Sequence, residues 1–333
     1  MAQRPASAAG TEREIVAPVA LCRADGSFDP AARGFSRGPL SACEVPGHWG
    51  RRKRWHYWGV TSPREIVSLT FVDLDYVGLA IAVVVDRASG RRFRGGALAP
   101  LGWRMPLPVR DGEGEVAVRR RRFGLSFRDL GREVALVVRA PGLAVDVTVT
   151  RPPGHETLGV GVGWDEQHFA YSAKHTALPA RGSLALDGVR RRLAEGAFAC
   201  LDFGRGVWPW RSAWNWASAA GVAGGRTLGL NLGARWTAGA GPSENALVVD
   251  GRIHKLPGEL RFDLDRRAPR RPWRIEGRGV TLRFRPELCE HPRLPLGVLA
   301  AELVLGFGHF EGRVLDHDLT GLFGWAEDFR ARW

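Results

Sequence analysis

The sequence contains few of the features that assign a protein to a well-known functional class. Lysine occurs only at Lys53, Lys174 and Lys255, although Lys and Arg total 48 and the formal net charge is +13. The basic residues are therefore almost all arginines, and they are scattered along the chain without a matching series of aromatic residues. We interpret this charge as a solvated, arginine-rich surface encoded by a GC-rich genome, and expect no specific nucleic-acid groove.

Paired cysteines are also missing. Cys22, Cys43, Cys200 and Cys289 are far apart and form no C-x-x-C motif, and Cys43 with His48 lacks the second pair that a zinc site needs. The spacing predicts reduced, isolated thiols, with no disulfide framework, no metal site and no cofactor.

Long apolar runs and familiar catalytic motifs are absent as well. No run approaches the length of a transmembrane segment, and residues 1–20 lack the apolar core of a secretory signal, which predicts a cytoplasmic protein. The sequence has no G-x-S-x-G elbow, no H-E-x-x-H, no P-loop and no G-x-G-x-x-G after a strand. Common hydrolase, metalloprotease and nucleotide-binding machinery is thereby excluded.

Short apolar segments separated by turns are abundant instead. The chain has 43 glycines and 21 prolines, and residues 187–188 and 250–251 are typical of hairpin turns. Segments over 55–150 predict a meander of antiparallel strands, and the same pattern resumes over 182–307. The sequence therefore predicts a mainly β protein built from two consecutive antiparallel β-barrel or β-sandwich halves.

The same pattern divides the chain into three parts. Residues 1–45 are polar and aperiodic and predict an irregular lead-in that wraps over a domain. Residues 46–170 predict the first β-barrel-like domain and residues 171–333 the second; the breaks at 152–154 and 173–181 are the candidate boundaries. Residues 316–333 are compatible with helical periodicity, so we expect a short helical C-terminus.

Residues 208–216 hold four tryptophans within nine positions, Trp208, Trp210, Trp214 and Trp216. In one extended strand these four side chains share a face, and Arg211 and Asn215 point to the other face. The arrangement predicts the wall of a ligand pocket in the second barrel, with all six residues as ligand-binding candidates.

Polar residues interrupt apolar strands close to this segment, at Asp202, Asn231, Glu244 and Asn245. Polar side chains that face inward must find partners. A glutamate paired with an arginine stays ionised, whereas a desolvated one is a candidate general acid. We take Glu244 and Asp202 as candidate catalytic residues and the two asparagines as ligand-binding candidates. A buried structural network, with Asp202 in a strand-end ion pair, is the alternative.

His175, beside Lys174, is a further ligand-binding candidate because it precedes the expected mouth of the second barrel. The alternative is a histidine whose hydrogen bonds are satisfied within a loop.

Motifs along nearly the whole chain resemble an uncharacterised, largely bacterial domain-of-unknown-function family. They include Gly34-Phe-Ser-Arg-Gly-Pro-Leu40, Lys53-Arg-Trp-His-Tyr-Trp58, Asp202-Phe-Gly-Arg-Gly206, Arg211-Ser-Ala-Trp-Asn-Trp-Ala217, Asn231-Leu-Gly233, Glu244-Asn245 and the ending Trp325-Ala-Glu-Asp-Phe-Arg-Ala-Arg-Trp333. His56 departs from the pattern, where the family is expected to have Asn, which argues against a catalytic role there. The doubled β architecture resembles two-domain lipocalin-like proteins, including carotenoid hydratases and pericyclases, and implies barrels able to hold one small ligand.

Three functions remain open at this point. The first is an enzyme with hydratase-, isomerase- or cyclase-type chemistry on an apolar or lipid-like molecule. The second is a non-catalytic carrier or sensor of such a ligand, and the third is a structural protein whose tryptophans fill the barrels. A structure with no cavity above about 300 Å³ near Trp214 would favour the third. The sequence does not specify an oligomeric state.

Overall fold

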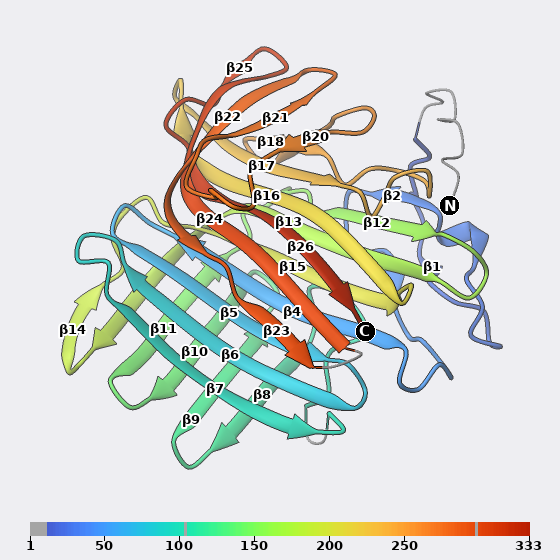
Figure 1. Ribbon diagram of the computed structural model, residues 1–333, viewed down its shortest axis with the longest axis horizontal. Coiled ribbons are helices and arrows are strands. Elements are labelled where there is room, and N and C mark those ends of the chain that lie inside the picture. The colour runs from blue at the N-terminus through green and yellow to red at the C-terminus, as the bar shows by residue number, and fades with distance from the viewer. Residues whose placement is uncertain (1–11, 103–104, 297–298) are drawn as a thin grey trace.

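Two antiparallel β-sheets make up most of the molecule (Figure 1). The structure is a computed structural model and describes residues 12–102, 105–296 and 299–333. Besides strands, these residues form one 3₁₀ turn, η1 (Pro30–Ala32), and a short parallel pair, β1 (Val19–Ala20) with β3 (Ser41–Ala42). Nothing helical in the described ranges is long and apolar enough to cross a membrane.

The first sheet has 13 strands, and its main path runs in the order β7-β6-β5-β4-β15-β13-β11-β10-β9-β8. The strands are β2 (Gly34–Ser36), β4 (Arg52–Thr61), β5 (Glu65–Asp73), β6 (Val77–Asp86), β7 (Arg92–Pro100), β8 (Glu115–Arg120), β9 (Phe123–Asp129), β10 (Glu133–Ala140), β11 (Leu143–Thr150), β12 (Leu158–Gly163), β13 (Phe169–Leu186), β14 (Val189–Arg192) and β15 (Phe198–Val207).

The second sheet has 11 strands, and its main path runs in the order β19-β18-β17-β16-β26-β24-β22-β21-β20. The strands are β16 (Arg211–Ala223), β17 (Arg226–Ala234), β18 (Ala246–Val249), β19 (Arg252–Lys255), β20 (Arg261–Asp263), β21 (Trp273–Gly277), β22 (Val280–Glu290), β23 (Arg293–Leu296), β24 (Leu299–Val314), β25 (His317–Asp318) and β26 (Phe323–Arg332).

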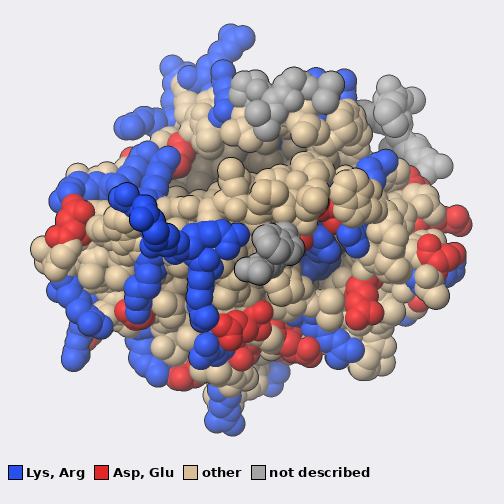
Figure 2. Space-filling model, turned by 90° about the horizontal axis from the view of Figure 1, so that it is seen from below, with Lys and Arg blue, Asp and Glu red and all other residues tan. Residues whose placement is uncertain are grey.

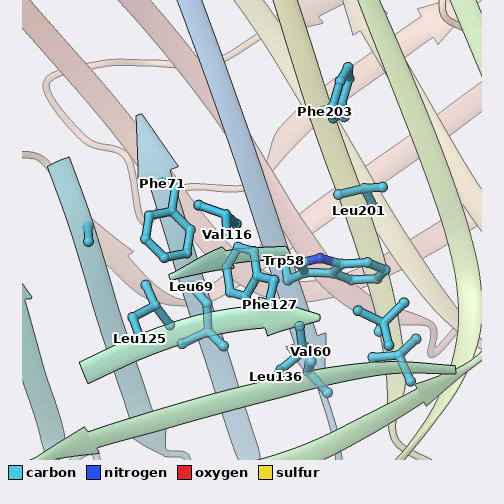
Figure 3. Close-up of a cluster of buried hydrophobic side chains, with 14 of the residues drawn as sticks. Trp58, Val60, Leu69, Phe71, Val116, Leu125, Phe127, Leu136, Leu201 and Phe203 are labelled. Atoms are coloured by element: carbon cyan, nitrogen blue, oxygen red, sulfur yellow. The ribbon is translucent and has the colours of Figure 1, made fainter. Parts of the chain in front are cut away.

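Each sheet curls around its own hydrophobic core. Side chains of β11 alternate strictly between buried and partly exposed, as expected for a strand with one face on a core. The first sheet nearly closes, because Gly95 of β7 lies so close to β9 that an added Cβ would be 2.8 Å from the Phe123 ring. Trp58, Phe71 and Phe127 are among the buried residues inside it (Figure 3). The predicted pair of barrel-like β halves is therefore confirmed.

The outer faces of the two barrels pack against each other. On β16, Ala217 and Ala219 face the second core, so Trp214 and Trp216 face the first sheet. Trp216 accordingly meets Tyr57 of β4, with ring centroids 5.9 Å apart. Figure 1 shows β16, β24 and β26 lying across β4, β13 and β15. This sheet-on-sheet contact is where the candidate site lies.

The chain passes from the first sheet to the second between Val207 and Arg211. The boundary predicted after residue 170 is about 40 residues too early, because β13, β14 and β15, which follow it, all pair within the first sheet. The sequence break at 173–181 corresponds to an irregularity inside β13, where the register shifts between His175 and Leu178 and Ala177 has a φ of 61°. A β-bulge interrupts the alternation there without ending the strand.

The predicted helical C-terminus is wrong. Residues 317–318 form β25 and residues 323–332 form β26, which pairs with β16 on one side and β24 on the other. Backbone hydrogen bonds to two neighbouring strands outweigh the weak helical preference of this segment.

Gly204 of β15 leaves room for the ring of Trp55, its register partner on the neighbouring strand β4. A Cβ at this position would lie 1.9 Å from Cε2 of Trp55, whose rigid ring cannot rotate out of its way cheaply. We predict that Gly204→Ala lowers the free energy of unfolding by about 3 kcal/mol, measured by urea denaturation. Gly38→Ala is the control, because no atom lies within 4 Å of its added Cβ; an equal effect of both substitutions would contradict the prediction.

Candidate functional site between the two sheets

The tryptophan segment is not one continuous strand, which corrects the prediction. β15 ends at Val207 and β16 begins at Arg211, so Trp208-Pro209-Trp210 forms the link between the sheets. Pro209 has no N–H to donate to a ladder, which favours a break at this point. Trp208 is buried, whereas Trp210 is 46% exposed.

Three of the four tryptophans nevertheless belong to one aromatic layer, the tryptophan wall. Its members are Trp55, Trp208, Trp214, Trp216, Trp236 and Trp325. Trp208 lies 5.4 Å from Trp214, 5.5 Å from Trp55 and 5.7 Å from Trp236 by ring centroids. Trp216 lies 5.3 Å from Trp325. The wall is therefore the contact layer between the sheets and not the lining of the second barrel.

A charged cluster is buried beside this wall. Lys174 of β13 places Nζ 2.9 Å from Oδ1 of Asp202 and 3.5 Å from Oε2 of Glu244. The same ammonium lies 3.9 Å from the centroid of the Trp216 ring. Burial opposes the charge of Lys174, but Asp202 and Glu244 outweigh it and raise the pKa of this lysine. The first sheet thus supplies the lysine and one carboxylate, and the loop before β18 supplies another.

The second sheet holds Glu244 in place through its neighbours. Trp236 Nε1 donates to Glu244 Oε1 at 2.6 Å, and Asn231 Nδ2 donates to the Glu244 carbonyl at 2.6 Å. Asn231 Oδ1 accepts from Trp216 Nε1 at 2.8 Å. A Cβ on Gly233 would collide with the Glu244 side chain, so a glycine is needed there. Burial raises the pKa of Glu244, and Lys174 only partly offsets this effect.

Glu327 of β26 is a third carboxylate of the site, although no motif in the sequence singles it out. It pairs in register with Trp216, and its Oε1 accepts from Trp214 Nε1 at 2.8 Å. Burial raises the pKa of Glu327 to about 7, opposed by the hydrogen bond from Trp214 and by Lys174. Both Trp214 and Glu327 are partly exposed. Glu327 can therefore exchange a proton near neutral pH at the side of the cluster that solvent reaches.

Several buried polar atoms of this layer have no hydrogen-bond partner among the described residues. They are the indole nitrogens of Trp55, Trp208 and Trp325 and Oε2 of Glu244. An unsatisfied buried polar group costs about 1–3 kcal/mol. Indole N–H groups are donors only, so a molecule that satisfied them would carry acceptor oxygens.

The remaining predicted residues lie outside this cluster. Arg211 is exposed at the start of β16. Asn215 faces the interior of the second barrel, where its Nδ2 donates to Asp328 Oδ2 at 3.0 Å. Asn245 accepts from the Gly233 N–H at 2.7 Å and donates to the Gly258 carbonyl at 3.1 Å. Both asparagines thus have structural partners within the second half.

His175 points into the first barrel, away from its neighbour Lys174. Its Nε2 lies 2.9 Å from Oδ2 of Asp111, and Tyr171 donates to the other oxygen of Asp111 at 3.1 Å. His56 lies in the same barrel and accepts from Trp58 Nε1 at 3.2 Å. Burial holds the pKa of His56 well below its usual range, so this imidazole stays neutral. These residues form a separate buried group.

The lysine content of the chain is a signal that could have identified Lys174. Of the three lysines, Lys53 and Lys174 are only 1% and 5% exposed, and the Lys255 side chain is 13% exposed. Nearly all basic residues on the surface are arginines, so a lysine in this sequence indicates a buried ammonium group. Glu327 and Tyr57 gave no comparable signal, because their roles depend on how the sheets pack.

Other sites of possible chemistry are limited in the described ranges. No group of three or more His, Cys, Asp and Glu side chains there is arranged to hold a metal ion. Cys200 adjoins the wall, but burial raises the pKa of its thiol to about 11, so it is not a thiolate at neutral pH. Clefts of about 550 Å³ and 480 Å³ lie at the β8–β9 turn and along β23, β24 and β26. Neither is lined by the wall, so neither supplies the cavity near Trp214 that would argue against a purely structural role.

Two curled antiparallel sheets in succession define a two-barrel, lipocalin-like protein, and solved structures agree with this fold. A structure of an AttH-type protein from Nitrosomonas europaea has a TM-score of 0.52 at 14% identity, covering 88% of this chain and 98% of the other. Kievitone hydratase from Nectria haematococca has a TM-score of 0.50 at 11% identity, covering 84% and 88%. CghA with Sch210972 has a TM-score of 0.52 at 13% identity, covering 88% and 89%.

The chain belongs to the family called domain of unknown function DUF2804, which it matches over residues 12–333. The family predicted from the sequence motifs is thereby confirmed. The search of curated proteins gave no match.

Proposed function

We propose that this protein binds an apolar small molecule bearing acceptor oxygens at the tryptophan wall and acts on it by acid–base chemistry. The observation that carries the proposal is the conjunction of two features: indole N–H groups without a hydrogen-bond partner in the described part of the chain, and a carboxylic acid whose pKa is near neutral. Aromatic faces would hold the apolar body, and the indole N–H groups would orient its oxygens.

The charged residues then take distinct roles. The ion pair of Lys174 and Asp202 holds a positive charge next to Glu244. Glu327 and Glu244 each transfer a proton to or from the bound molecule. In a hydration, protonated Glu327 would give its proton to one carbon of a double bond. Water would bond to the other carbon and lose a proton to Glu244. Proton return through solvent regenerates both carboxyls, and an isomerisation or cyclisation would use the same two proton transfers without water.

The structural relatives support this choice of reaction class. One relative is a hydratase, and a small molecule accompanies another, CghA. At 11–14% identity they carry no residue assignments to this chain.

Quenching of tryptophan fluorescence by 9,10-dibromostearate tests binding, because bromine quenches indoles that it touches. We expect saturable quenching that unbrominated stearate reverses, and a loss of affinity of about tenfold in Trp214→Phe/Trp216→Phe, equivalent to about 1.4 kcal/mol. Trp273→Phe is the control, since this fully buried indole lies in the second core.

The outcomes separate the three functions. Absence of saturable quenching would support tryptophans that merely fill the contact layer. Quenching that both variants retain would place the ligand elsewhere. Binding at the wall with no new compound detected by mass spectrometry, after incubation with an apolar cell extract, would support a carrier.

A further inference from the structure

One end of the first barrel carries a ring of arginines that the proposed function does not use. The β4–β5, β6–β7, β8–β9, β10–β11 and β13–β14 turns all lie at this end, as the antiparallel registers require. Arg91 pairs with Asp187, and Arg191 pairs with both Glu65 and Asp86, which joins these turns side by side.

We define the arginine rim as the exposed arginines at this end that have no carboxylate partner within the described part of the chain. They are Arg64, Arg119, Arg120, Arg121, Arg122, Arg190 and Arg192. The nearby carboxylates Asp86, Asp187 and Asp146 are already engaged by Arg191, Arg91 and Arg139. Figure 2 shows many basic side chains on the left half of the face seen from below, with a few acidic side chains among them.

A cleft of about 550 Å³ opens within the rim. Arg119–Arg122 and Arg139 line it, together with the apolar side chains of Val118, Phe123, Leu125, Val137, Ala140 and Pro141. Guanidinium groups thus lie over an apolar floor. Val189, next to Arg190, is 68% exposed and adds an apolar side chain at the neighbouring turn.

We infer that the arginine rim docks the protein on the surface of an anionic lipid bilayer. Guanidinium groups bind phosphate oxygens, while the exposed side chains of Val189 and Pro141 match the acyl region just below the headgroups. A nucleic acid fits less well. Phe123 is only 5% exposed and Phe93 is partly buried, so neither offers an open ring face to a base.

Sedimentation with lipid vesicles tests the inference. The full chain should bind vesicles containing phosphatidylglycerol, should not bind vesicles of phosphatidylcholine alone, and should be released by high salt. Replacing Arg119, Arg120, Arg121 and Arg122 by Gln should weaken binding at least about tenfold. Thermal unfolding of the variant should match that of the wild type, because these side chains are exposed.

The control removes the same charge from the second sheet, by replacing Arg261, Arg274, Arg278 and Arg283 with Gln; all four are exposed on or beside β20, β21 and β22. This variant should still bind. Equal loss in both variants, binding to neutral vesicles, or absence of binding to anionic vesicles would overturn the inference. The inference would also be overturned, in favour of nucleic-acid binding, if a 20-base-pair DNA duplex displaced the protein from anionic vesicles at a concentration below that of the lipid.

Discussion

Lys174→Met is expected to lower the free energy of unfolding by about 3–5 kcal/mol in urea denaturation. The lysine is 5% exposed and is the one ammonium that contacts both Asp202 and Glu244. Methionine keeps most of the volume and removes the charge, so the two carboxylates are left buried without compensation.

The double variant Lys174→Met/Glu244→Gln separates this electrostatic effect from lost packing. Gln at 244 still accepts from the Trp236 indole but needs no counter-charge. We expect the double variant to regain at least about 1 kcal/mol relative to Lys174→Met. If Lys174→Met alone costs less than about 1 kcal/mol, or if the second substitution brings no recovery, the cluster is not a coupled buried ion system.

Glu327→Gln is expected to lower turnover at least about 100-fold, because glutamine cannot donate or accept a proton in the reaction. Turnover is followed by mass spectrometry of the compounds that the wild type converts in an apolar cell extract. The affinity for dibromostearate should change less than about threefold, since the amide still accepts from Trp214. Glu311→Gln is the control, because this partly exposed carboxylate of β24 pairs with Arg285 and lies outside the site. Equal activity of Glu327→Gln and wild type would remove Glu327 from the mechanism.

The raised pKa of Glu327 also predicts a dependence of stability on pH. Its pKa is about 7 in the folded protein against an ordinary value of 4.5. The folded state therefore binds more protons than the unfolded state between these values, and its contribution to stability, complete below about pH 4.5, is lost as the pH rises through about 7. The wild type should lose stability relative to Glu327→Gln over this interval, and a proton-donating role would make turnover fall above about pH 7.

Much of the fold could be predicted from the sequence because each strand carries its own signal. Alternation of apolar residues and the Asp187-Gly188 and Asp250-Gly251 turns are local features, and the structure has hairpins at both turns. The helix wrongly predicted at the C-terminus shows the limit of such local signals. Residues 323–332 lie in a central strand whose identity is set by β16 and β24, not by local preference.

The candidate site was only partly predictable, because it is formed between two sheets. Trp214, Trp216, Asn231 and Glu244 were selected for their types and positions, and they do lie together. The prediction placed them inside the second barrel, whereas they lie between the two sheets. A strand pattern does not reveal which face of the strand packs against the other sheet. Glu327 was missed for that reason: its neighbours Trp214 and Trp216 are more than 100 residues away in sequence.

A crystal structure of the protein soaked with 9,10-dibromostearate would test the central claim most directly, because the anomalous scattering of bromine locates the ligand without reference to any interpretation. We predict bromine peaks between the sheets, against Trp214 and Trp216 and close to Glu327. Bromine peaks inside either barrel would contradict a binding site between the two sheets. The absence of a peak at the tryptophan wall after soaking at a saturating ligand concentration would contradict it as well.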